Sequence, residues 1–133
     1  MRWLAVMAIA ALGVGYAPPD RCLTASGRAI GVWRIQIELL ATGSSARVSS
    51  SYAEDGPVQQ TTLYQGTYTE LPDTLTLSLT SRQEHYYDTQ QSTGYTQEAR
   101  PHRETLVLYR KADTWYLLEG NPDTNHDLPL SPC

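Results

Sequence analysis

Strict alternation of apolar and polar residues is the feature that most constrains the fold of this chain of 133 residues. From Trp33 to Leu39 the odd positions are apolar and the even positions are polar. The pattern returns from Leu75 to Leu79, where three leucines alternate with threonine and serine. Successive side chains of a strand point to opposite faces, so a period of two residues predicts half-buried β-strands. No stretch after residue 17 has a convincing 3.6-residue period, and the sequence therefore predicts an all-β domain.

Six strands are expected, over residues 31–39, 47–52, 58–70, 74–87, 104–110 and 114–119. Together with the intervening segments they favour an antiparallel up-and-down meander of six to eight strands, closed into a small lipocalin-like barrel. A two-layer β-sandwich is the alternative. Gly66, in the middle of a strand, predicts a bulge or a sharp bend of the kind that barrels need.

Two segments lack a clear pattern. Residues 88–101 are polar and aperiodic, so this connection is expected to be functional or mobile, or to contain a ragged extra strand. The tail from Gly120 to Cys133 contains three prolines and is expected to run irregularly back to Cys22.

The N-terminus has the pattern of a secretory signal peptide over residues 1–17, followed by a single domain over residues 18–133. Arg2 forms the charged region, and an apolar run from Trp3 to Val14 leads to small residues that end at Ala17. This run is well short of the roughly 20 residues that cross a bilayer, so a membrane anchor is the less favoured alternative. We therefore expect an exported protein, periplasmic or secreted, with no stable membrane span after cleavage.

The chain has two cysteines, Cys22 near the expected mature N-terminus and Cys133 at the last position. In an oxidising compartment such a pair predicts one disulfide, which would hold the two chain ends side by side. Free thiols or an intermolecular bridge are the alternatives.

The charge of the chain excludes a general nucleic-acid binder. Its formal net charge is −4, and Lys111 is its one lysine. Nucleic-acid binders neutralise phosphates with clustered Lys and Arg, and this chain lacks such a cluster.

Gly31-Val32-Trp33, at the start of the first clear strand, resembles the Gly-x-Trp signature of lipocalins and related calycin barrels. The resemblance implies that Trp33 plugs the closed end of a barrel and that Arg103 or Arg110 packs over it. The layout is also similar to that of the small periplasmic barrels that inhibit C-type lysozymes, which tie early and terminal cysteines together. Their inhibitory loop carries Ser-Gly-x-x-Tyr, whereas this chain has Ser92-Thr93-Gly94-Tyr95, so lysozyme inhibition is not implied.

Titratable residues near the long polar connection could converge if their strands pair. Glu84 and His85 precede it, Asp88 is its first residue, and His102 and Glu104 follow it. Such a group could form a metal or acid–base site, but its spacing matches no zinc pattern. We therefore expect no enzyme activity, no catalytic residues, no metal and no cofactor.

Tyrosine dominates the aromatic residues, since the chain contains nine Tyr and no Phe. The favoured hypothesis is a monomeric binding protein, an inhibitor or an immunity-type factor, that presents a loop and a tyrosine-rich rim to a protein partner. The alternative is a lipocalin-like carrier of a small apolar or amphipathic ligand. For the partner the candidate residues are His85, Tyr86, Tyr87, Tyr95 and Arg100, and for the ligand they are Trp33, Tyr64 and Tyr68.

Overall fold

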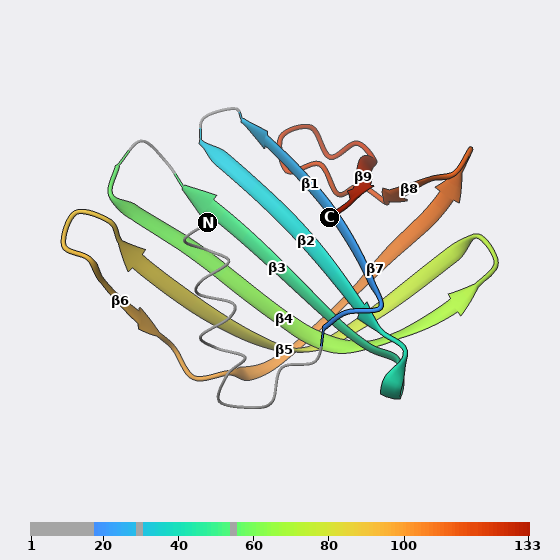
Figure 1. The fold of residues 1–133 in the computed structure, drawn as a ribbon, viewed down its shortest axis with the longest axis horizontal. Coiled ribbons are helices and arrows are strands. Elements are labelled where there is room, and N and C mark those ends of the chain that lie inside the picture. The colour runs from blue at the N-terminus through green and yellow to red at the C-terminus, as the bar shows by residue number, and fades with distance from the viewer. Residues whose placement is uncertain (1–17, 29–30, 54–55) are drawn as a thin grey trace.

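The computed structural model describes residues 18–28, 31–53 and 56–133, and the predicted signal peptide lies outside these ranges. The described residues form nine strands and one short 3₁₀ turn (Figure 1). The strands are β1 (Arg21–Arg28), β2 (Val32–Leu40), β3 (Ser45–Ala53), β4 (Val58–Leu71), β5 (Thr74–Asp88), β6 (Thr93–Thr96), β7 (Arg100–Lys111), β8 (Thr114–Leu117) and β9 (Leu128–Pro132), and the turn is η1 (Thr42–Ser44). No helix in the described part of the chain is long and apolar enough to span a lipid bilayer.

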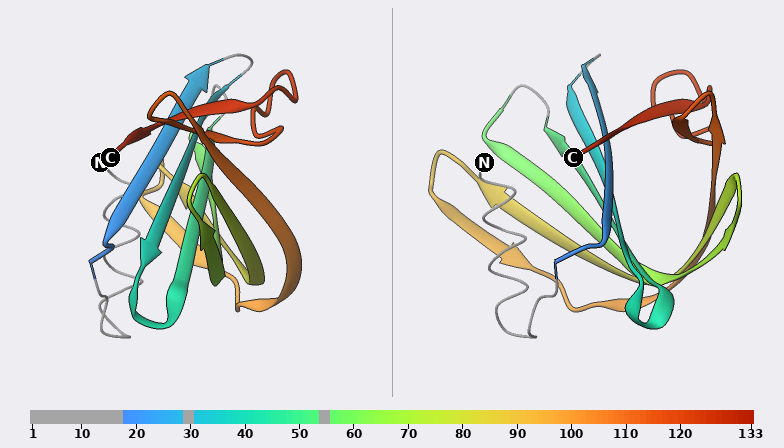
Figure 2. Two further views of the ribbon diagram at one scale, coloured as in Figure 1. Left: turned by 90° about the vertical axis from the view of Figure 1, so that its right-hand side faces the viewer. Right: turned by 45° about the vertical axis from the view of Figure 1, so that its right-hand side comes forward.

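Eight of these strands close into an antiparallel barrel. Each strand pairs with the next in the order β1, β2, β3, β4, β5, β7, β8 and β9, and β9 pairs with β1 to close the barrel. Figure 2 shows this closure from two sides, with the C-terminal tail crossing to β1. The predicted barrel is therefore confirmed and the sandwich alternative is wrong, since the strand order returns to its start.

Leucine and isoleucine side chains fill the middle of the barrel. The alternating residues of β2 and β5 point inward as predicted, and Ile37, Leu75 and Leu77 have no exposed surface. The six largest fully buried side chains are Ile37, Leu39, Leu75, Leu77, Leu79 and Leu108. A small barrel needs most of its inward side chains to fill its own core, and these side chains do so.

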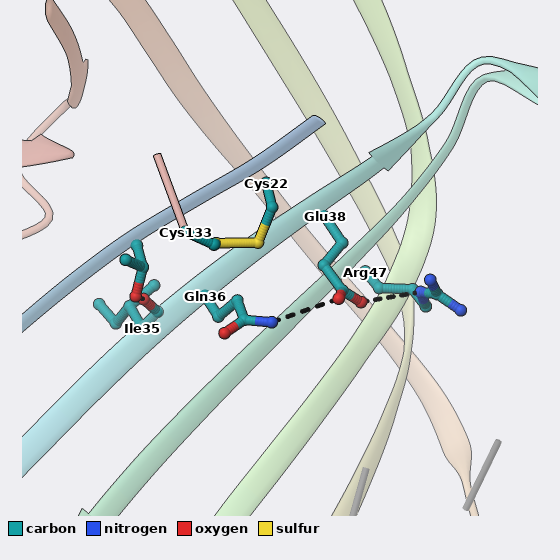
Figure 3. Close-up of a disulfide and its surroundings, with 7 residues drawn as sticks. Cys22, Ile35, Gln36, Glu38, Arg47 and Cys133 are labelled. Atoms are coloured by element: carbon teal, nitrogen blue, oxygen red, sulfur yellow. Dashed lines mark hydrogen bonds and ion pairs between the residues drawn. A yellow bond between two sulfur atoms is a disulfide. The ribbon is translucent and has the colours of Figure 1, made fainter. Parts of the chain in front are cut away.

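The disulfide lies on the outer face of the barrel, because Cys22 precedes the core residue Leu23 on β1. Figure 3 shows the bond and its surroundings. Cys22 and Cys133 are joined with a Cα–Cα distance of 5.4 Å, so the predicted pairing and the neighbouring chain ends are confirmed. Cys22 lies opposite Glu38, which accepts a hydrogen bond from Gln36 Nε2 at 3.2 Å and pairs with Arg47 Nε at 3.1 Å. Glu38 is only 4% exposed, so the polar face of β2 is less open to solvent than its pattern suggests.

Gly66 is at a bulge, as its position in the sequence predicts. The β4–β5 register shifts between Gln65 and Gly66, so that Gln65 lies opposite Ser81 but Gly66 lies opposite Leu79. Thr80 is therefore the extra residue of β5, and the strand alternation changes phase there. A Cβ atom on Gly66 would collide with the carbonyl oxygen of Ser78, which explains why glycine occupies this position.

Three strands differ from the sequence expectation. β1 was not expected, although Leu23 and Ala25 of this strand belong to or pack against the core. β9 replaces the irregular tail, because Leu128 and Leu130 are 5% and 4% exposed and pack into the barrel.

Proline is tolerated in β9 because each part of this strand has a partner on one side. Leu128 to Leu130 pair with β8, whereas Ser131 and Pro132 pair with β1. The missing proline N–H can then lie on the side without a partner.

The third strand that differs from the expectation is β7, which begins at Arg100, four residues before the expected start.

Candidate functional site

The polar connection after β5 folds back along this strand and forms the outermost strand of the sheet. In β6, Tyr95 lies opposite Tyr86 and Gly94 lies opposite Tyr87. Among the described strands, β6 pairs with β5 alone, so its second edge is free. Figure 1 shows β6 at the left margin of the sheet, alongside the end of β5. The extra strand that was one of the alternatives for residues 88–101 is therefore present.

The phase change at Thr80 decides which residues of β5 face the barrel interior. Tyr64 packs against the core, and its partner in the register is Arg82. Arg82, Glu84 and Tyr86 therefore share the inner face, while the residues between them point outward. We call the inner-face group Val58, Tyr86, Asp88, Thr93 and Tyr95 the tyrosine rim.

Glu84 lies beneath the tyrosine rim, is 8% exposed, and interacts with two arginines and a tyrosine. Its Oε1 lies 2.5 Å from Arg82 Nη2, and its Oε2 accepts a hydrogen bond of 2.9 Å from the Tyr86 hydroxyl. Arg100 Nη2 lies 3.9 Å from the same Oε2. The bond from Tyr86 and the two arginines hold the pKa of Glu84 below its ordinary value. The same bond raises the pKa of Tyr86, so the tyrosine stays a neutral donor.

Tyr86 and Tyr95 form a stacked pair on the inner face. Their ring centroids are 5.0 Å apart and their planes differ by 22°. Tyr95 is 59% exposed and Val58 is 52% exposed, whereas Tyr86 is partly buried, so the solvent-open part of the pair is Tyr95. An open pocket of about 330 Å³ lies among the tyrosine rim residues, with Tyr87 and Gly94 also in its lining.

The outer face of the same strands carries the other two aromatic candidates. His85 Nδ1 lies 2.5 Å from Thr96 Oγ1, and burial lowers the pKa of the imidazole. The Tyr87 ring covers Gly94, where a Cβ atom would come within 3.1 Å of it. Of the five predicted partner-binding residues, the structure therefore brings Tyr86, Tyr95 and Arg100 together and places His85 and Tyr87 on the opposite face.

Of the titratable residues considered for catalysis, Glu84, His102 and Glu104 lie around Tyr64, whereas His85 and Asp88 are engaged elsewhere. Glu84 is engaged by arginines and tyrosine, His85 points to the other face, and His102 Nε2 lies 2.9 Å from Glu104 Oε1. Asp88 Oδ1 accepts hydrogen bonds from the backbone N–H groups of residues 90 and 91 in the β5–β6 turn. Across the described ranges, no three His, Cys, Asp or Glu side chains are grouped to hold a metal ion.

The three residues expected to line a ligand cavity lie at different levels of the barrel. Trp33 lies six residues before Leu39 on β2. Leu39 pairs with Ala46 and Ala46 pairs with Gly66, so Gly66 lies at the level of Leu39. Tyr68 lies two residues beyond Gly66, so roughly 25 Å of strand separates it from Trp33. Tyr64 lies between these levels and packs at 5.2 Å from the His102 ring.

The surroundings of Trp33 differ from those that the lipocalin resemblance implies. The indole covers Gly27 on the neighbouring strand and donates a hydrogen bond of 3.0 Å to Asp123. Arg110 lies over Trp115 instead, with Cζ 5.6 Å from the ring centroid, and it also bonds Asp73. The expected packing of Arg110 on Trp33 is therefore wrong, and Arg103 is exposed. A second open pocket of about 330 Å³ has Trp33 and Tyr52 in its lining.

Sequence reasoning missed Arg82, Val58 and Thr93 as members of this site and considered Glu84 only for catalysis. The alternation of Arg82, Glu84 and Tyr86 was a usable signal, because residues two apart on a strand share a face. Nothing in the sequence marked Val58, whose side chain joins the rim through the pairing of β4 with β5.

We expect Glu84→Gln to reduce the acid sensitivity of folding. The pKa of Glu84 is lower in the folded chain than in the unfolded chain, so its stabilisation is present above about pH 4.5 and is lost as pH falls through the folded pKa. Urea unfolding from pH 7 to pH 3 should show a smaller loss of stability for Glu84→Gln than for the wild-type chain. Exposed Glu98→Gln is the control and should keep the wild-type slope. Equal slopes for all three proteins would contradict this role of Glu84.

Comparison with known proteins adds no family to this description: no protein-family model, no curated protein and no solved structure matches the chain.

Proposed function

We propose that this chain is an exported, monomeric, non-enzymatic binding protein that presents the tyrosine rim to a protein partner, as an inhibitor or an immunity-type factor does. The observation that carries the proposal is the exposed ring of Tyr95, which stacks on the partly buried Tyr86 beside the free edge of β6. No cofactor or metal takes part in this function.

The rim has the physical properties of a protein-binding surface. Tyrosine offers a large apolar area with a polar tip and loses little conformational freedom when it is buried by a partner. The bond from Tyr86 to Glu84 and the stacking on Tyr95 fix the orientation of the pair before binding. Preorganisation of this kind lowers the entropic cost of association.

The packing of the barrel favours a protein partner over a small ligand held inside. Ile37, Leu39 and Leu79 are fully buried, and in the register they lie between the level of Trp33 and the level of Tyr68. A ligand that touched both aromatic residues would have to displace this core. The Cys22–Cys133 disulfide supports the exported location, because structural disulfides persist in oxidising compartments.

Site-specific photo-crosslinking tests the proposal. p-Benzoylphenylalanine is introduced in place of Tyr95 or, as a matched control, in place of Leu71, which is 62% exposed at the other end of the β4–β5 hairpin. We expect illumination of the producing cells to give a discrete protein adduct from position 95 and none from position 71. Adducts of equal yield at both positions, or none at position 95, would contradict the proposal.

A further inference from the structure

The free edge of β6 offers backbone groups for pairing with another chain. All four residues of β6 are exposed, and within the described part of the chain β5 is their one neighbour. The hydrogen-bonding groups of a strand alternate between its two sides, so half of those in β6 point away from β5. Such an edge is a template for an added strand.

β6 lacks the features by which exposed edges are usually protected. Its sequence, Thr93-Gly94-Tyr95-Thr96, contains no charged residue and no proline, and it pairs with β5 without a register shift. Natural edge strands often carry lysine, proline or a bulge that prevents further pairing. The edge is therefore open to a strand from a partner.

The spacing of the tyrosine pair favours an aromatic residue on that strand. The Tyr86 and Tyr95 centroids are 5.0 Å apart, which is close to the separation of neighbouring strands, about 4.8 Å. A residue opposite Tyr95 on the next strand would therefore lie at stacking distance from its exposed ring.

Asp88 favours a basic residue on the added strand at the position opposite Thr93, two residues from the position opposite Tyr95. Asp88 and Thr93 lie opposite each other on the inner face, and both line the open pocket beside Val58. A side chain opposite Thr93 would enter this pocket from the free edge. Lysine or arginine would cover the apolar wall with its stem and bring its charge to the Asp88 carboxylate.

We propose that the partner binds by adding an extended segment to the free edge of β6, with an aromatic residue opposite Tyr95 and a basic residue opposite Thr93. This inference rests on the proposed function and specifies the mode by which the partner is recognised. Backbone pairing supplies affinity in this mode, and the two side chains supply specificity.

A library of random 12-residue peptides displayed on phage tests the inference with the whole mature protein as target. We expect the enriched peptides to share an aromatic and a basic residue two positions apart. In the synthesised peptides, methylation of alternate backbone nitrogens should weaken binding at least tenfold when it falls on the β6 side and less than twofold when it falls on the other side. Enrichment of peptides without this pattern, no enrichment, or equal tolerance of methylation on both sides would overturn the inference.

Protein variants separate the parts of the site. Tyr95→Ala should weaken peptide binding at least tenfold, and Asp88→Asn should weaken it severalfold because it removes the charge but keeps the oxygen that caps the turn. Leu71→Ala, far from the site, should change it less than twofold. Equal affinities for all three variants would overturn the inference.

Hydrogen exchange distinguishes failure of this inference from failure of the proposed function. If a protein crosslinked from position 95 binds without slowing exchange of the β6 amides, strand addition is wrong and the proposed function stands. If position 95 gives no adduct, the proposed function itself fails. A dimer of the free chain with protected β6 amides would also overturn the inference, since a second copy would then occupy the edge.

Discussion

Replacement of both Cys22 and Cys133 by serine is expected to lower the free energy of unfolding by about 4–5 kcal/mol. The disulfide joins residues that are 111 positions apart, so it restricts nearly the whole unfolded domain. Without it, the closure between β1 and β9 consists of two residue pairs, Leu23 with Pro132 and Thr24 with Ser131, and one backbone hydrogen bond from residue 133 N–H to the carbonyl oxygen of residue 22. This closure is short, so the covalent bond carries much of the stability of the seam.

Urea unfolding of the oxidised wild-type protein and the double serine variant measures this effect. A reducing agent should destabilise the wild-type protein to the level of the variant and leave the variant unchanged. A difference below about 1 kcal/mol would show that the β1–β9 pairing holds the ends without the covalent bond.

Gly66→Ala is expected to lower the free energy of unfolding by about 3 kcal/mol or more. The added Cβ would collide with the Ser78 carbonyl oxygen and lie 2.8 Å from Leu79 Cα, and both of these are backbone atoms that no side-chain rotation can move. Relief would require the bulge at Thr80 to open, which would disturb the phase of every later residue of β5.

Thr67→Ala is the matched control for this prediction, because Thr67 is the exposed neighbour of Gly66 on β4. Its stability should remain within about 0.5 kcal/mol of the wild-type value. Equal unfolding midpoints for the two variants would contradict the close approach at Gly66.

Strands with a complete alternation of apolar and polar residues could be predicted from the sequence. Strands that form only because neighbouring strands pair with them could not. β2 and the first half of β5 have four and three apolar residues in strict alternation, and both lie where expected. β1 contains glycine and serine, and β9 contains two prolines, so neither has a local preference for a strand. Both are strands because Leu23, Leu128 and Leu130 complete a core that other strands create.

The candidate site was predictable in its location but not in its division between two faces. Simple continuation of the Leu75–Leu79 alternation would place His85 and Tyr87 inside. The extra residue at Thr80 reverses this assignment and turns Glu84 and Tyr86 inward. Gly66 indicated a bulge, but the opposing residue on β5 depends on a register that the local sequence does not contain.

The most direct test of the account is the affinity of the partner isolated by crosslinking for three forms of the mature protein, measured by calorimetry. Tyr95→Ala, in a variant that keeps the wild-type melting temperature, is expected to weaken binding at least tenfold, as the loss of an aromatic anchor does. Leu71→Ala should bind within twofold of the wild-type protein. Equal affinities of Tyr95→Ala and the wild-type protein would contradict the claim that the tyrosine rim is the binding surface.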